Sequence, residues 1–328
     1  MRWAAVTSDG LMGILKRGEP AMIKSTVMAL FMGVVAVVSG EVVGQGGGYR
    51  APEGVSYRTA EVVSEGTKIR AEVFAPDGAT GKLPTVVMSH GWGGTAESLR
   101  VDGGAFARAG YLVVTVDYRG WGASEGRLIR KNGELVEVRG VVDPIEQTTD
   151  ILNTLHWVRG EAMCDPERIG LWGSSFSGGH VVYVAARDLG VKALVSQVGS
   201  MDGRWVLADP QLSAYAHGQA TARARGVIGY PEPFAAFSGM RGQPVWEKVM
   251  RYAPIEDIGR TGHAAKLFIV AEHEELFDNA DHAVLAHERA PGVKKLVTVE
   301  GITHYGIYEE KRAEAQRLAI EWYDAHLK

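Results

Sequence analysis

The segment LWGSSFSGG (171–179) places three serines within four positions, between an apolar run and a predicted helix. A serine on a tight turn between a strand and a helix can act as a nucleophile, provided that the residues two before and two after it are small. Ser174 is excluded because both of these neighbours are aromatic, whereas Ser175 and Ser177 satisfy the condition. The size of the neighbours therefore leaves two candidate nucleophiles.

The predicted end of the strand decides between these two serines. RIGLWG (168–173) is typical of a strand that ends at Gly173, so Ser175 falls on the turn and Ser177 inside the first helical turn. The N-terminus of that helix also favours negative charge close to Ser175. We therefore predict Ser175 as the nucleophile. Position 177 departs from the usual G-x-S-x-G motif, and a serine-rich helix N-cap is the alternative interpretation.

A serine hydroxyl becomes a nucleophile only when a base takes its proton, and a carboxylate must orient that base. His304 follows the last predicted strand, in GITHYGIYEE, and is the predicted base. The preceding strand runs into IVAEHEELFD, where Glu274 is favoured as the acid and Asp278 is the next choice. Asp202, which follows another predicted strand, is a topologically possible substitute.

Acyl transfer also turns a carbonyl oxygen into an anion, which two preorganised N–H donors must stabilise. The predicted donors are the backbone N–H groups of Phe176, directly after the nucleophile, and of Trp92 in SHGWGG (89–94). A flexible turn is the alternative interpretation of GWGG. A phosphate loop is disfavoured because its lysine and its spacing are missing.

Four other histidines are expected to have no catalytic part. His90 is predicted to shape its loop, and His180 to pack within the helix after Ser175. His282 and His287 lie five positions apart without a carboxylate at helical spacing, so we expect both on the surface. Because neither a zinc-site spacing nor an HExxH motif occurs, we predict no metal, and the chemistry requires no organic cofactor.

Apolar runs and turn residues predict strands that alternate with helices. The predicted strands are 60–76 (a hairpin turning at Glu65 and Gly66), 83–90, 111–117, 168–173, 191–199, 266–272 and 294–300. The predicted helices are 96–109, 143–158, the stretch after Ser177, the 280s and 308–327. This order requires a mostly parallel sheet with the opening hairpin as an antiparallel edge and helices on both faces. The candidate residues then gather at the carboxyl ends of the strands.

Two segments interrupt this alternation. RLIRKNGELVEVRG (127–140) is typical of a polar hairpin. The stretch from about 200 to 262 is too long for a plain connection, and we interpret it as a small helical cap over the site. An insertion without contact to the substrate is the alternative. The aromatic residues of this stretch are Trp205, Tyr215, Tyr230, Phe234, Phe237 and Trp246.

Residues 1–47 are predicted to be a signal peptide and linker, and 48–328 to be the catalytic domain. STVMALFMGVVAVVSG (25–40) is a short apolar core followed by small residues, typical of a secretory signal peptide that starts at Met22. We expect a secreted or periplasmic protein without stable membrane association after cleavage, an uncleaved membrane anchor being the alternative. Cys164 is the single cysteine, so no intramolecular disulfide can form.

The composition of the 328 residues, 46% apolar and 23% charged, is ordinary for a globular enzyme. The 35 basic and 39 acidic residues are spread along the chain, without a basic run or a stripe of interleaved aromatic and basic residues. A nucleic-acid partner is therefore not expected, and a small molecule is the predicted substrate.

The motifs together resemble one branch of the α/β-hydrolases. SHGWGG, DYRGWGASEG, DPERIGLWGSSFSGG and GITHYGIY are similar to segments of dienelactone-hydrolase-like esterases and of the Xaa-Pro dipeptidyl-peptidase and cocaine-esterase group. The resemblance covers the chain from about residue 55 to its end. It implies the α/β-hydrolase fold and an esterase-type serine hydrolase, with Ser175 as nucleophile, His304 as base and Glu274 in the place of the usual aspartate.

The expected activity is hydrolysis of a carboxylic ester through an acyl-enzyme intermediate. A peptidase or amidase of the Xaa-Pro type is the first alternative, because nothing in the sequence selects oxygen over nitrogen leaving groups. A non-catalytic binding protein on the same fold is the second. By resemblance alone, Asp117 and Arg119 are expected to brace loops.

Overall fold

The structure is a computed structural model that describes residues 48–230 and 241–328. The predicted signal peptide and its start at Met22 lie outside the described residues, as do Phe234 and Phe237 of the predicted cap. No helix among the described residues is long and apolar enough to cross a membrane.

The centre of the fold is an eight-stranded sheet with the order β1-β2-β4-β3-β8-β9-β11-β12. Its strands are β1 (Val55–Ser64), β2 (Thr67–Pro76), β3 (Leu83–Ser89), β4 (Leu112–Val116), β8 (Cys164–Ser174), β9 (Val191–Gln197), β11 (Ala265–Ala271) and β12 (Lys294–Val299). β1 pairs antiparallel with β2, and β2 pairs antiparallel with β4; the pairs from β4 to β12 are parallel. The predicted mostly parallel sheet with an antiparallel hairpin at one edge is confirmed.

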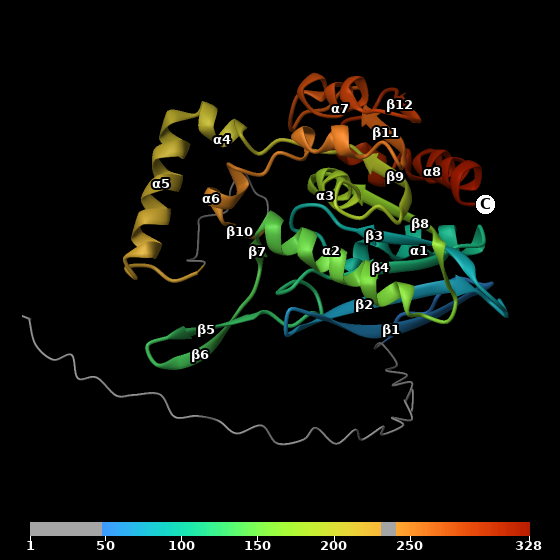
Figure 1. Cartoon of the computed structure of the whole chain (residues 1–328), viewed down its shortest axis with the longest axis horizontal. Coiled ribbons are helices and arrows are strands. Elements are labelled where there is room, and N and C mark those ends of the chain that lie inside the picture. Colours follow the sequence, from blue (N-terminus) through green and yellow to red (C-terminus); the bar gives the residue numbers. More distant parts are fainter. Residues whose placement is uncertain (1–47, 231–240) are drawn as a thin grey trace, which may run out of the picture. The chain divides into compact units, whose positions relative to one another are not determined.

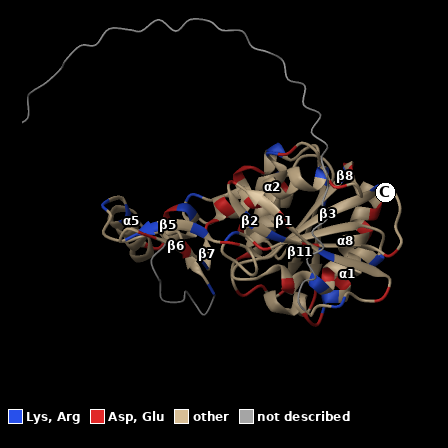
Figure 2. Ribbon diagram, turned by 90° about the horizontal axis from the view of Figure 1, so that it is seen from below, with Lys and Arg blue, Asp and Glu red and all other residues tan. Residues whose placement is uncertain are grey.

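Helices cover both faces of this sheet, as expected for strands that are apolar on both sides. One face is covered by α2 (Pro144–Arg159), α3 (Phe176–Ala185) and α7 (Ala283–Arg289), and the other by α1 (Arg100–Arg108) and α8 (Arg312–Leu327). Within β3, Val87 packs with the first set while Val86 and Met88 pack with the second. Figure 2 shows this division, with α2 on one side of the strands and α1 on the other.

Short 3-10 helices and small strands complete the connections. The 3-10 helices include η1 (Ala96–Leu99), η3 (Pro254–Glu256), η4 (Ile258–Arg260), η5 (Asn279–Asp281) and η6 (His304–Tyr308). The predicted polar hairpin is formed by β5 (Arg127–Lys131) and β6 (Glu134–Val138), which extend from the body of the fold (Figure 1). The helix predicted for 96–109 is divided between η1 and α1, and the last helix begins at Arg312 because η6 occupies the positions before it.

The described part of the insertion at about 200–262 is mainly helical, as expected. It contains α4 (Trp205–Ala208), α5 (Pro210–Ala224) and α6 (Trp246–Val249), together with β10 (Gln243–Pro244), which pairs with β7 (Val141–Val142). α5 lies at the periphery of the fold (Figure 1), and Ala216 is its single buried residue. That this insertion covers the substrate stays a prediction.

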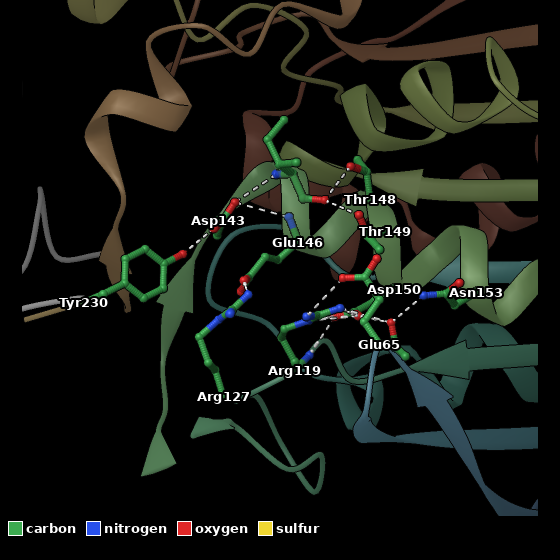
Figure 3. Close-up of polar contacts among 12 residues, drawn as sticks. Glu65, Arg119, Arg127, Asp143, Glu146, Thr148, Thr149, Asp150, Asn153 and Tyr230 are labelled. Atoms are coloured by element: carbon green, nitrogen blue, oxygen red, sulfur yellow. Dashed lines mark hydrogen bonds and ion pairs between the residues drawn. The ribbon is translucent and has the colours of Figure 1, made fainter. Parts of the chain in front are cut away.

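Asp143 attaches the insertion to the body of the fold. It caps α2 by accepting the backbone N–H groups of Ile145 and Glu146, and Pro144 occupies the first turn. The same carboxylate accepts hydrogen bonds from the Tyr230 hydroxyl and from the Lys248 ammonium (Figure 3 shows the tyrosine). One buried carboxylate therefore stabilises both the start of α2 and the position of the insertion.

His180 is buried within α3, as the sequence predicts. Its Nδ1 lies 2.7 Å from the hydroxyl of Tyr252, and its Nε2 lies 3.1 Å from Oε1 of Gln147 on α2. Burial lowers the pKa of His180 from its ordinary value of 6.5 to about 3. The imidazole is therefore neutral in the folded protein at every pH where the protein is expected to work.

This burial predicts a loss of stability in acid. The pKa of His180 is lower in the folded state than in the unfolded state, so the unfolded chain binds the extra proton as the pH falls below 6.5. Between pH 7 and pH 4.5, we expect the free energy of unfolding to fall by about 2 kcal/mol more in the wild type than in His180→Gln. Urea unfolding followed by circular dichroism measures this difference, and carboxylates titrate alike in both proteins. Parallel pH profiles would contradict the assignment.

Candidate active site

Ser175 lies on the turn between β8 and α3, with a backbone conformation that side chains rarely adopt. Its φ is +57° and its ψ is −125°. Its N–H donates to the carbonyl of Gln197 at 2.9 Å, and its own carbonyl accepts from the N–H groups of Gly178 at 2.8 Å and Ser200 at 3.0 Å. Three hydrogen bonds therefore hold the serine in a strained conformation, as an exposed nucleophile requires.

The crowding expected around this turn is present. A Cβ atom at position 173 would overlap the carbonyl group and the hydroxyl of Ser177, so only glycine fits where β8 ends. A Cβ atom at position 178 would overlap the backbone of Gly199. Serine occupies position 177, where its hydroxyl makes the polar contacts described below.

His304 reaches Ser175 from the other end of the chain. It is the first residue of η6, which follows β12, and its Nε2 lies 3.1 Å from the Oγ of Ser175. Its side chain is 1% exposed. The structure thus brings together the hydroxyl and the imidazole that the sequence predicted as nucleophile and base.

Glu274 contacts the opposite nitrogen of the same imidazole. Its two carboxylate oxygens lie 2.8 and 2.9 Å from Nδ1 of His304, and its side chain is 2% exposed. The backbone N–H of Leu276 donates to the same carboxylate at 3.1 Å. A buried carboxylate with this pairing keeps a proton on Nδ1, which leaves Nε2 free to accept the proton of Ser175.

The two alternative acids are engaged elsewhere. Asp278 caps η5 by accepting the N–H of Ala280 at 2.8 Å, and Asp202 pairs with the guanidinium of Arg204. Within residues 48–230 and 241–328, neither carboxylate contacts His304. Glu274 is therefore the carboxylate that the fold places at the imidazole.

The neighbouring serines point away from His304. The Oγ of Ser177 contacts the Oγ of Ser89 and lies 3.2 Å from the hydroxyl of Tyr118, in a buried cluster at the start of α3. The Oγ of Ser174 lies 2.8 Å from the hydroxyl of Tyr308, on the turn that carries His304. The geometry therefore separates Ser175 from Ser177, which side-chain size alone could not do.

The two predicted oxyanion donors flank Ser175. Phe176 is the first residue of α3, and Gly91 lies so close that a Cβ atom there would sit 2.7 Å from the Cβ of Ser175. The rings of Trp92 and Phe176 pack with centroids 5.2 Å apart. In the part of the chain that the structure describes, the backbone N–H groups of Trp92 and Phe176 have no intramolecular acceptor, so both can donate to a bound oxyanion.

Three other histidines singled out in the sequence form no hydrogen bond with Ser175 or Glu274, and one expectation about them is wrong. His90 is buried beside Tyr118 and its Nδ1 lies 2.9 Å from the carbonyl of Gly91, while burial lowers its pKa to about 4. His282, expected on the surface, is only 6% exposed, because its ring packs beneath the loop that contains Met201. His287 is half-buried against Phe268.

Asp117 and Arg119 connect loops near the site. The carboxylate of Asp117 accepts from the backbone N–H groups of Ala96, at 2.7 Å, and Ala123, at 2.9 Å. The guanidinium of Arg119 forms a buried two-pronged pair with Asp150 of α2, with a shortest distance of 2.6 Å (Figure 3). Both contacts have the bracing geometry that the resemblance implied.

Two contributors were not identified from the sequence. Glu275 accepts the backbone N–H of His304 at 2.6 Å, so adjacent glutamates hold the side chain and the main chain of one histidine. Tyr308 ties the histidine turn to Ser174. The pair Glu274–Glu275 after a predicted strand was visible in the sequence, but their different tasks depend on the position of η6.

Among the described residues, no group of three or more His, Cys, Asp or Glu side chains could hold a metal ion.

Comparisons with known proteins agree with this architecture. A family model described as X-Pro dipeptidyl-peptidase (S15 family) matches residues 65–223, which include Ser175 but end before Glu274 and His304. This match confirms the resemblance to the Xaa-Pro dipeptidyl-peptidase group. An uncharacterized 31.7 kDa protein of Escherichia coli, from the traX-finO intergenic region, is 28% identical over 301 residues, which cover 82% of this chain and 99% of that protein.

Two solved structures show the same fold at low sequence identity. The hypothetical protein PA2218 from Pseudomonas aeruginosa is 17% identical with a TM-score of 0.70, over 85% of this chain and 96% of that chain. Acetyl xylan esterase 1 from Thermoanaerobacterium sp. JW/SL YS485 is 18% identical with a TM-score of 0.58, over 84% of this chain and 86% of that chain. Identities at this level show the fold alone.

The crowding at the turn makes a prediction about two glycines. Gly173→Ala should destabilise the protein by about 3 kcal/mol or more, because the added Cβ overlaps the backbone of Ser177. Gly218→Ala is the matched control, since Gly218 lies in the exposed helix α5 with open space around its Cβ position. This control should instead gain about 0.5–1 kcal/mol. Thermal and urea unfolding test both variants, and equal stabilities would contradict the crowded turn.

Proposed function

We propose that this chain, which has the α/β-hydrolase fold, is a serine hydrolase that cleaves carboxylic esters through an acyl-enzyme intermediate. The observation that carries the proposal is the continuous chain of contacts from Glu274 through His304 to Ser175, with distances of 2.8 and 3.1 Å. The arrangement supplies a nucleophile, a base and an orienting carboxylate at hydrogen-bond distance.

In the acylation step, Nε2 of His304 takes the proton of Ser175 while Oγ attacks the carbonyl carbon of the ester. Positive charge develops on the imidazole, and Glu274 stabilises it through Nδ1–H without becoming protonated. The carbonyl oxygen becomes an anion and accepts the N–H groups of Trp92 and Phe176. Collapse of this intermediate breaks the bond to the alcohol, which leaves with the proton from Nε2.

In the deacylation step, water replaces the alcohol. His304 removes a proton from the water, the resulting hydroxide attacks the acyl carbon, and the same two N–H groups stabilise the second oxyanion. The acid product is released when Ser175 regains its proton from Nε2. The chain's own residues thus complete the cycle and return to their starting protonation states.

Cleavage of peptides is the second candidate function, because the matched family model describes X-Pro dipeptidyl-peptidases. The proposal keeps esters, the substrate class expected from the sequence motifs, because the family match covers residues 65–223 only and the fold is one that acetyl xylan esterase 1 also has. Hydrolysis of p-nitrophenyl esters without hydrolysis of dipeptide anilides would support the esterase. The reverse result would establish the peptidase.

The nucleophile can be tested directly with a fluorophosphonate probe, which reacts with activated serines. We expect the wild type and Ser177→Ala to be labelled and Ser175→Ala to remain unlabelled and without esterase turnover. Circular dichroism should show that both variants are folded, since Ser175 contributes its hydroxyl mainly to the contact with His304. Labelling of Ser175→Ala would move the nucleophile elsewhere. An unlabelled, inactive wild type would instead support the non-catalytic alternative.

The acid can be tested by neutralising each candidate carboxylate. Glu274→Gln should lower kcat by about 10³–10⁴-fold, because an amide stabilises neither the correct tautomer nor the imidazolium. Asp278→Asn and Asp202→Asn are the controls, and both should keep kcat within about twofold of the wild type. Neither carboxylate contacts His304, so neither substitution removes an interaction that stabilises the transition state. Steady-state kinetics on a p-nitrophenyl ester measures all three. A large loss in either control, with Glu274→Gln unaffected, would overturn the assignment.

A further inference from the structure

His282 lies between two loops of the candidate site, although it contacts neither Ser175 nor Glu274 by a hydrogen bond. It precedes α7 directly, and its ring is 6% exposed. Its Nδ1 accepts the backbone N–H of Met201 at 2.9 Å. Since an N–H group can only donate, Nδ1 must be unprotonated, and the neutral ring carries its hydrogen on Nε2.

The first of the two loops, residues 198–204 between β9 and α4, supports the nucleophile. The N–H of Ser200 donates to the carbonyl of Ser175 at 3.0 Å, next to the Met201 N–H that His282 accepts. Val198 opens this loop with a φ of +40°, which is strained for a β-branched residue. A strained segment keeps its conformation only when surrounding contacts hold it, and His282 provides such a contact.

The second loop, between β11 and α7, carries Glu274. Phe277 in this loop packs its ring edge against His282, with centroids 4.6 Å apart. The same phenyl ring lies 5.7 Å from the ring of His304. His282 therefore contacts the support of the nucleophile on one side and an aromatic neighbour of the base on the other.

We propose that His282 is a positioning residue of the proposed hydrolase. Its unprotonated Nδ1 holds the loop 198–204 in place under Ser175 and fixes the position of this loop relative to the loop that carries Glu274. The inference rests on the proposed function. Protonation of Nδ1 would turn the acceptor into a donor that faces the Met201 N–H, and the loop would lose its restraint.

The groups around His282 determine the pH range in which Nδ1 gains a proton. Burial lowers its pKa, and the carboxylates of Asp202, Asp281, Glu274 and Asp278, from the two loops and the start of α7, oppose that shift. The folded imidazole is therefore neutral at pH 7 and gains its proton only in acid. Full turnover should then require the neutral form of His282, and acid should release the loop 198–204 from its hydrogen bond.

Two substitutions separate hydrogen bonding from packing. His282→Asn places Oδ1 close to the position of Nδ1, so it keeps an acceptor that does not titrate near neutral pH. His282→Leu fills a similar space without an acceptor. His287→Asn, in the same helix, is the matched control because its half-buried ring packs against Phe268 rather than the loop 198–204.

On a p-nitrophenyl ester at pH 8, we expect His282→Leu to lower kcat about tenfold with KM nearly unchanged, since the hydrogen bond positions the nucleophile and does not touch the substrate. His282→Asn should keep kcat within about threefold of the wild type, because the asparagine oxygen still accepts the Met201 N–H and a threefold change is smaller than the loss of one hydrogen bond. As the pH falls into the acid range, kcat of the wild type should drop by up to about tenfold more than kcat of His282→Asn, because protonation of Nδ1 removes the same hydrogen bond that His282→Leu removes.

Hydrogen exchange gives a readout that needs no turnover. The amides of Ser200 and Met201 should exchange at least tenfold faster in His282→Leu than in the wild type or His287→Asn, since one hydrogen bond corresponds to about that factor. A kcat and amide exchange rates in His282→Leu that equal those of the wild type would overturn the proposal. If that variant does not fold, a ratio of kcat between His282→Asn and the wild type that stays constant from pH 8 into the acid range would overturn the proposal. An inactive wild type that the fluorophosphonate does not label would refute the proposed function, whereas the exchange rates would still report on His282.

Discussion

The backbone conformation of Ser175 is the constraint on which the site depends. A φ of +57° is costly for a residue with a side chain, and the cost is about 1–3 kcal/mol. The fold sustains it by ending a buried strand and starting a buried helix at the same residue, while Gly178 and Ser200 donate to the serine carbonyl. With its backbone held in this way, the serine projects its hydroxyl beyond the end of the sheet, where the loops after β3, β9, β11 and β12 surround it.

Two adjacent glutamates hold His304. Glu274 binds its side chain and Glu275 binds its backbone N–H, so one short loop after β11 sets both the position of η6 and the orientation of the imidazole. The side chains of Glu274 and His304 are almost fully buried, which strengthens their interaction because little water competes for either group. Tyr308 adds a contact from the same turn to Ser174, beside the nucleophile. The loops that carry the chemistry are thereby restrained against one another as well as against the sheet.

Sequence patterns predicted the elements correctly where the structure depends on residues that are neighbours in the chain. The hairpin turn at Glu65 and Gly66, the parallel strands and the helix that begins near residue 143 all follow from local periodicity and turn residues. His282 shows the limit of such arguments. It was expected on the surface because no carboxylate lies at helical spacing, yet its environment comes from Met201, 81 positions earlier in the chain. Burial of this kind depends on which loops the sheet order makes adjacent, and no local pattern contains that information.

The sequence by itself determined the order of strands and helices, the serine-rich turn after β8, and the residue types available for a nucleophile, a base and an acid. It did so because alternation, residue size and turn preferences act over a few neighbouring positions. The sequence also favoured Ser175 as nucleophile and Glu274 as acid, but only the tertiary structure decided that both contact His304, that Glu275 holds its backbone N–H and that His282 is buried. These choices depend on distances of a few ångströms between loops that lie far apart in the chain. Such distances are set by strand register and by the packing of helices on the sheet.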